Sequence, residues 1–146
     1  ASASVSVLAV TSIVGRLLGG WIVTRFPIRL FTILNIVGQW MGLTVLAFAD
    51  DSFSALVGTV LFGFTVGNLL MLQPLLLVKV YGVLRYPRVY SAAYALTTLG
   101  VAGGPLALGL LYQSFSYTTS FGVAGVCSIV ALFIFCSAGP VVDVET

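Results

Sequence analysis

The sequence predicts an all-α integral membrane protein, a partial helical bundle with five transmembrane helices. Apolar residues make up 60% of the 146 residues, whereas soluble domains contain about 45–50%. Charged residues make up only 7%, against about 25% in soluble proteins. Six basic and four acidic side chains are too few to cover the surface of a soluble domain of this size. We therefore expect the chain to fold in a lipid bilayer.

Five apolar segments are each long enough to cross the membrane. A bilayer core about 30 Å thick requires a helix of about 20 apolar residues. None of the segments alternates polar and apolar residues, and backbone polar groups in lipid must pair within their own segment, so helices are expected. The five segments form one membrane domain over residues 1–146 and are Ala3–Val23, Leu30–Ala49, Ser54–Val78, Ser91–Tyr112 and Thr119–Ala138.

The basic residues predict the orientation of these helices. Arg25 and Arg29 follow the first segment, and Lys79, Arg85 and Arg88 follow the third. The second and fourth connections contain no basic residue. Because short basic loops stay on the cytoplasmic side, we expect the first helix to run inward and the C-terminus to be cytoplasmic. The membrane would be a plasma or inner membrane.

The sequence lacks the residues of the common enzyme and metal sites. It contains no histidine, and no Asp or Glu lies inside the apolar segments. These absences argue against Ser-His-Asp, zinc and paired-carboxylate chemistry. The net charge of +2, without a basic run, does not indicate a nucleic-acid partner. We expect no enzyme activity, no cofactor and no metal.

Small residues and one proline predict how the helices pack and bend. Membrane helices approach each other closely through small residues four positions apart. Pro105 removes a backbone hydrogen bond directly after Gly103 and Gly104, so a bend is expected there. The plain alternative is that proline is common in membrane helices. The glycine pairs with the close-packing spacing are Gly15 with Gly19, Gly63 with Gly67, and Gly100 with Gly104.

Arg16 is the most costly side chain in the predicted spans. It precedes Arg25 by nine residues, or about 13 Å of helix, and an arginine at depth costs about 2.5–3.5 kcal/mol. Three interpretations are open: a cavity or an anionic ligand, an acidic residue on another helix, and a side chain that extends to the headgroups. We favour the anion, because guanidinium binds a carboxylate through two parallel hydrogen bonds. Ser12, one turn earlier, can add a hydroxyl.

Two further polar residues are candidates for substrate binding. Asn68 shares a face of the third segment with Thr65, and Tyr94 lies with Thr97 and Thr98 near the start of the fourth. Hydrogen bonding between helices is the alternative for each of them.

Four local segments resemble the major facilitator superfamily. Residues 15–29, GRLLGGWIVTRFPIR, resemble its glycine-and-arginine loop, with Thr24 where the family commonly has Asp. VYGVLR (80–85) is similar to the inner loop after the tenth helix, and GVAGGPLALG (100–109) to the glycine-proline helix that follows. LLYQSFSY (110–117) is similar to the outer turn before the last helix, especially in monocarboxylate-porter and oxalate/formate branches. Their order implies helices eight to twelve; helices two to six are the alternative.

The resemblance implies a fragment of a secondary transporter that moves a small organic anion, such as a monocarboxylate, by alternating access and symport. Arg16 matches the arginine that contacts the substrate carboxylate, and Ser12 replaces an Asp common in these relatives. The remaining helices of the full-length transporter would be the partners of this chain. Residues 91–112 lack the lysine of the oxalate exchangers, which argues against a dicarboxylate. The expected gating or helix-bending residues are Gly103, Gly104, Pro105 and Arg25.

Two other function classes remain open at this point. The first is a multidrug or sugar carrier of the same fold, in which Arg16 has a packing or gating role. The second is a non-transporting membrane interaction module, in which Arg16 pairs with an acidic helix of a partner protein. Arg16→Leu separates the module from the anion carrier, since it disrupts association in a module, whereas in the anion carrier it leaves folding intact and removes solute binding.

Overall fold

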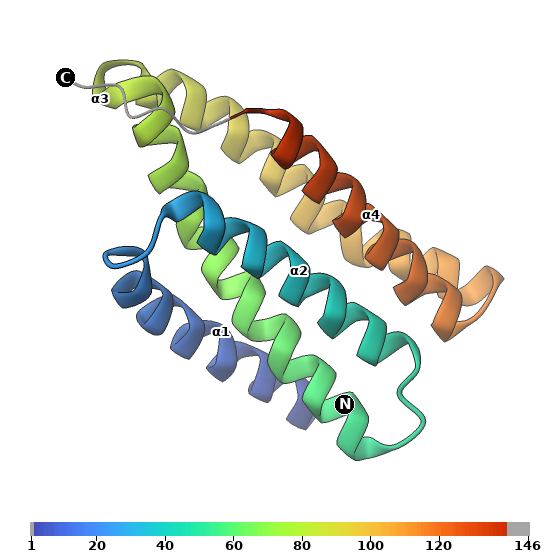
Figure 1. The fold of residues 1–146 in the computed structure, drawn as a ribbon. Helices are drawn as coiled ribbons and strands as arrows, with labels where there is room; N and C mark the ends of the chain where they lie inside the picture. The colour runs from blue at the N-terminus through green and yellow to red at the C-terminus, as the bar shows by residue number, and fades with distance from the viewer. Residues whose placement is uncertain (1, 140–146) are drawn as a thin grey trace.

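The computed structural model of the chain describes residues 2–139 and folds them into four long helices (Figure 1). All four are long and apolar enough to cross a membrane. The expected membrane domain is thus built from continuous apolar helices. The helices are α1 (Ser2–Val23), α2 (Ile28–Ala47), α3 (Ser52–Ser114) and α4 (Tyr117–Ser137).

α3 contains the third and fourth predicted segments and the connection between them. Its 63 residues keep helical dihedrals except at Gly82, where φ is 70° and ψ is 165°. Glycine adopts a positive φ without the penalty that a side chain brings, and the chain reverses there (Figure 1). We call residues 52–81 the first arm and residues 83–114 the second arm of α3. The expectation of a loop over residues 79–90 is wrong, because one glycine suffices to break the helix.

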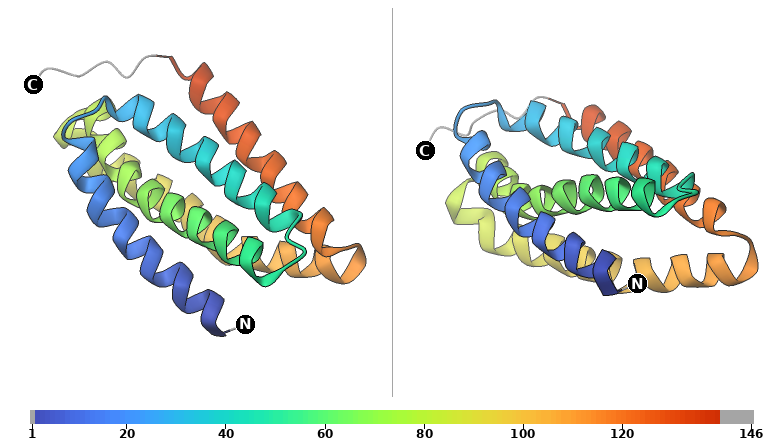
Figure 2. Two further views of the ribbon diagram at one scale, coloured as in Figure 1. Left: turned by 60° about the horizontal axis from the view of Figure 1, so that its bottom comes forward. Right: turned by 90° about the horizontal axis from the view of Figure 1, so that it is seen from below.

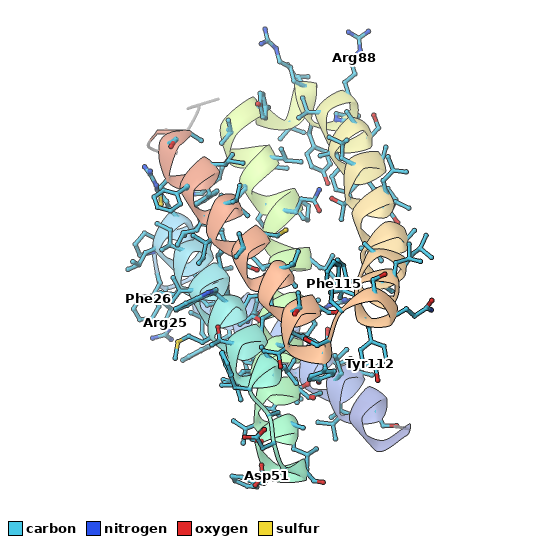
Figure 3. All side chains as sticks on the ribbon, turned by 90° about the vertical axis from the view of Figure 1, so that its right-hand side faces the viewer. Arg25, Phe26, Asp51, Arg88, Tyr112 and Phe115 are labelled. Atoms are coloured by element: carbon cyan, nitrogen blue, oxygen red, sulfur yellow. The ribbon has the colours of Figure 1, made fainter. Side chains whose placement is uncertain are left out.

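The ends of the helices gather at two opposite ends of the bundle. The α1–α2 connection, the Gly82 turn and the end of α4 lie together, while the start of α1 and the other two connections lie at the far end (Figure 2). Arg88 and Asp51 mark these two ends (Figure 3). The alternation of helix directions agrees with the predicted topology. The assignment of the basic end to the cytoplasm stays a prediction, and residues 140–146 of the C-terminal tail lie outside the described residues.

Polar groups hold several helix ends in place. The side chain of Asp51 begins α3 by accepting a hydrogen bond from the Ser54 amide at 2.9 Å. Arg29, at the start of α2, donates a hydrogen bond of 3.2 Å to the carbonyl oxygen of Cys136 in the last turn of α4. A cation near a helix C-terminus is favourable because the last carbonyls lack partners in the helix.

Buried hydroxyl and amide groups mostly bond within their own helix. Thr32 donates to the carbonyl oxygen of Ile28 at 2.8 Å, and Asn35 donates to that of Phe31 at 2.8 Å. The small apolar core beside them consists of Ile28, Phe31 and Leu72. The residues packed against this core are Ile22, Val23, Leu69, Met71 and Leu76. Thr32 and Asn35 are therefore satisfied within α2 and do not join helices.

Candidate functional site

α1 and the first arm of α3 approach each other through four glycines. A Cβ atom added at Gly15 would lie 2.6 Å from the carbonyl oxygen of Phe64. Gly63 faces the hydroxyl of Thr11, and Gly67 faces the backbone carbonyl of Ser12, both too closely for a side chain. We call Gly15, Gly19, Gly63 and Gly67 the glycine seam. Two of the three predicted glycine pairs are therefore confirmed as helix contacts.

The third predicted glycine pair does not make such a contact. A Cβ atom at Gly100, Gly103 or Gly104 would meet nothing within 4 Å among the described residues. The expectation that Gly100 and Gly104 pack against a helix of this chain is wrong, because this face of the second arm has no neighbour here. Gly82 is the residue of α3 that departs from helical dihedrals, so the helix continues through Pro105, and the bend expected there stays a prediction. The gating role of Gly103, Gly104 and Pro105 stays a prediction.

Asn68 lies inside the glycine seam. Its side chain is 0% exposed, and both amide atoms, Oδ1 and Nδ2, are buried without a hydrogen-bond partner. It packs directly against Gly19, where a Cβ atom would overlap the amide oxygen. In this conformation the structure therefore seals Asn68 between two helices.

Arg16 lies beside the seam on α1 and is exposed. It precedes the end of α1 at Val23 by seven residues, which is about 10 Å of helix. Its side chain makes no hydrogen bond or ion pair among the described residues. Ser12 is half-buried one turn earlier, with its backbone carbonyl against Gly67. The acidic residue on another helix, which the sequence left open as a partner of Arg16, stays a prediction.

Tyr94 belongs to a column of aromatic rings on the second arm. Its ring centroid lies 5.7 Å from that of Tyr90, which stacks on Tyr86 at 5.0 Å. The spacing of four residues places all three rings on one helix face. Tyr94 remains 57% exposed. This column was not predicted, although the spacing of the three tyrosines in the sequence indicates it.

A hydrogen-bonded pair joins the two arms of α3. Gln73 Nε2 donates to Thr97 Oγ1 at 3.0 Å, and Thr97 also donates to the backbone carbonyl of Ala93. The contact of Gln73 was not predicted, although a glutamine in an apolar span indicates such a contact between helices. An open, almost wholly apolar cavity of about 330 Å³ adjoins this pair. Its lining residues are Thr32, Leu69, Leu72, Gln73, Leu76, Leu77, Ala93 and Phe135.

Arg25 lies in the connection between α1 and α2, two residues after the end of α1, at the basic end of the bundle. Its guanidinium carbon is 5.0 Å from the centre of the Trp21 ring, a distance at which a cation is attracted to an aromatic face. The gating role expected for Arg25 stays a prediction.

Within the described residues no three His, Cys, Asp or Glu side chains form a group that would hold a metal ion.

Comparison with known proteins identifies the family. Residues 1–144 match the sequence model of the Major Facilitator Superfamily. Over 141 residues the chain is 30% identical to a protein named Inositol transporter 4 from Arabidopsis thaliana, in an alignment that covers 93% of this chain and 24% of the relative. The chain thus spans about a quarter of that relative's length, and no solved structure matches it. The chain belongs to the major facilitator superfamily, whose members are membrane transporters rather than enzymes.

Proposed function

We propose that this chain supplies five membrane-crossing segments of a secondary transporter that moves a small organic anion, such as a monocarboxylate, by alternating access. Carriers of this type bind their solute near the middle of the bilayer between two groups of helices. We place the segments as helices eight to twelve of the carrier, with the basic end of the bundle in the cytoplasm. Family membership supports transport over the interaction-module interpretation.

Arg16 carries the proposal of an anionic solute. It is a permanently charged side chain about 10 Å from the end of a membrane helix, exposed, and without a protein partner among the described residues. Such a charge in a membrane span requires water, an anion or another part of the protein. A carboxylate satisfies the guanidinium with two parallel hydrogen bonds. Ser12, Asn68 and Tyr94 are proposed as further contacts to the solute.

One observation favours a second substrate class, a polyol or sugar. The relative with 30% identity is named an inositol transporter. The polar groups of the first arm and second arm, Asn68, Gln73, Thr97 and Tyr94, are uncharged and offer both donors and acceptors. Such a set suits hydroxyl groups as well as it suits a carboxylate. In this second case Arg16 has a packing or gating role.

Uptake by the full-length carrier in liposomes separates the two substrate classes. Lactate tests the monocarboxylate, and inositol tests the polyol. We expect Arg16→Gln to lower lactate uptake about tenfold or more, because one charge-assisted hydrogen-bond pair is lost. Arg88→Gln is the matched control, since Arg88 is an exposed arginine at the end of the bundle (Figure 3). Lactate uptake that is unchanged in Arg16→Gln would contradict the anion, and inositol uptake without lactate uptake would establish the polyol.

A further inference from the structure

We infer that α1 and the first arm of α3 separate along the glycine seam during transport, and that Asn68 is the solute-binding residue that this separation uncovers. Its amide would then bind an oxygen-bearing group, a hydroxyl or a carboxylate, of the transported solute. The inference rests on the proposed function, because it requires that the chain is part of a carrier that changes conformation. To that proposal it adds that the contact between α1 and the first arm opens, and that Asn68 binds solute only when this contact is open.

The first support is the unsatisfied amide of Asn68. Both Oδ1 and Nδ2 are buried without a partner, and the side chain is 0% exposed. Buried polar groups are nearly always hydrogen-bonded, so an unpaired amide in a close-packed interface needs an explanation. A second state in which the amide is bonded provides one.

The second support is that the other buried asparagine behaves differently. Asn35 donates to the carbonyl oxygen four residues earlier, that of Phe31, at 2.8 Å. The corresponding carbonyl for Asn68 is that of Phe64, which packs against Gly15 of α1. The amide of Asn68 makes no such bond and faces Gly19 instead. Asn68 is therefore held toward α1, where no group of α1 satisfies it.

The third support is the kind of surface that covers Asn68. The seam is made by glycines facing backbone carbonyls and short side chains of the opposite helix. At Gly15, Gly63 and Gly67 the nearest atoms of the opposite helix are backbone atoms or a threonine hydroxyl, so these contacts can open without a change of rotamer in a long side chain. Gly19 covers the Asn68 amide directly, since any side chain at position 19 would overlap that amide.

The position of Arg16 indicates the chemistry of the solute at the seam. Arg16 and Gly19 are three residues apart in α1, so they are neighbours on the helix surface. A solute that replaces Gly19 in front of Asn68 therefore meets a charged donor beside a neutral amide. The amide donates through Nδ2 and accepts through Oδ1. A small molecule with both a carboxylate and a hydroxyl, or several hydroxyls, matches this pair.

Thiol labelling tests whether Asn68 becomes accessible. In the full-length carrier with Cys127 and Cys136 replaced by Ser, Asn68→Cys is treated with a charged, water-soluble methanethiosulfonate. Leu72→Cys is the matched control, because Leu72 lies one turn further on the same helix and is also 0% exposed. We expect labelling at position 68 but not at 72. Failure to label position 68, with or without lactate or inositol, would overturn the inference.

Solute uptake by Asn68→Leu distinguishes a binding role of Asn68 from a structural role, because a structural role alone would leave uptake unchanged. Leucine has a similar volume and no unpaired polar atoms, so we expect a higher thermal midpoint. If Asn68 binds the solute, uptake falls about tenfold. A higher midpoint with unchanged uptake would overturn the inference while leaving the proposed function intact. If the unmutated carrier takes up neither lactate nor inositol, the proposed substrates fail, and the labelling comparison still decides whether Asn68 becomes accessible.

Discussion

The glycine seam and the second arm of α3 carry the same sequence spacing and have different surroundings. Gly63 and Gly67 face backbone and short side-chain atoms of α1 so closely that a Cβ atom would clash. Gly100 and Gly104 have the same separation of four residues, and a Cβ atom there would meet nothing within 4 Å. Glycine spacing therefore identifies helices that are able to approach closely, and the opposite surface decides whether they do so.

The two regions also differ in what their polar residues do. In the seam, Asn68 is sealed and unpaired. On the second arm, Thr97 bonds to Gln73 across the two arms, and the rings of Tyr90 and Tyr94 lie together on the helix surface. Close packing at the seam thus excludes partners for a polar group, while the open second arm leaves room for them.

The largest effect is expected from filling the seam. Gly67→Leu places a side chain against the backbone carbonyl of Ser12, which cannot rotate away, and should lower the free energy of unfolding by about 3 kcal/mol. Gly100→Leu is the control on the second arm. Thermal unfolding of the purified carrier in detergent measures both. An equal loss in Gly100→Leu would show that another segment of the carrier covers that face.

A smaller effect is expected from the contact between the two arms. A double-mutant cycle with Gln73→Leu and Thr97→Val should give a coupling energy of about 0.6 kcal/mol, typical of hydrogen bonds between membrane helices. Thermal or denaturant unfolding of the four proteins supplies the values. A coupling energy of zero would mean that the second arm is not held to the first by this pair.

The smallest effect is expected at the start of the first arm, outside the membrane. Hydrogen bonds from the Ser54 hydroxyl and the Ser54 amide hold the pKa of Asp51 below its ordinary value of 3.8. Because the pKa is lower in the folded chain, the cap stabilises α3 above pH 3.8 and loses this contribution as the pH falls through the folded pKa. The hydrogen-exchange protection of the first-turn amides, measured relative to their intrinsic exchange rates, should therefore fall at acid pH. In Asp51→Ala this fall in protection should be absent.

Much of the fold follows from composition, charge and apolar segment length. The first two helices and the last agree with the predicted spans to within a few residues, because each is bounded by turn or capping residues such as Pro27 and Ser116. The helix through residues 79–90 was not predictable in this way. Three basic residues and Pro87 resemble a loop in composition, and only the dihedrals of Gly82 show a single-residue break.

The candidate site was less predictable than the fold. Arg16 and Asn68 stand out in an apolar sequence because polar groups are costly in lipid. Whether such a residue is sealed or exposed depends on the residue opposite, and nothing in the segment around Asn68 identifies Gly19 as its neighbour. The interaction between Gln73 and Thr97 was missed for the same reason, since it joins residues 24 positions apart.

The most direct test compares two adjacent glycines of α1. A Cβ atom at Gly19 would overlap the sealed amide of Asn68, whereas one at Gly20 would lie 3.6 Å from the Met71 sulfur, an ordinary contact. The measurement is the thermal midpoint of the carrier with Gly19→Ala and with Gly20→Ala. We expect a clear fall for Gly19→Ala and no fall for Gly20→Ala, which gains up to about 1 kcal/mol of helix propensity. Equal midpoints for the two variants would contradict the close contact of α1 with Asn68.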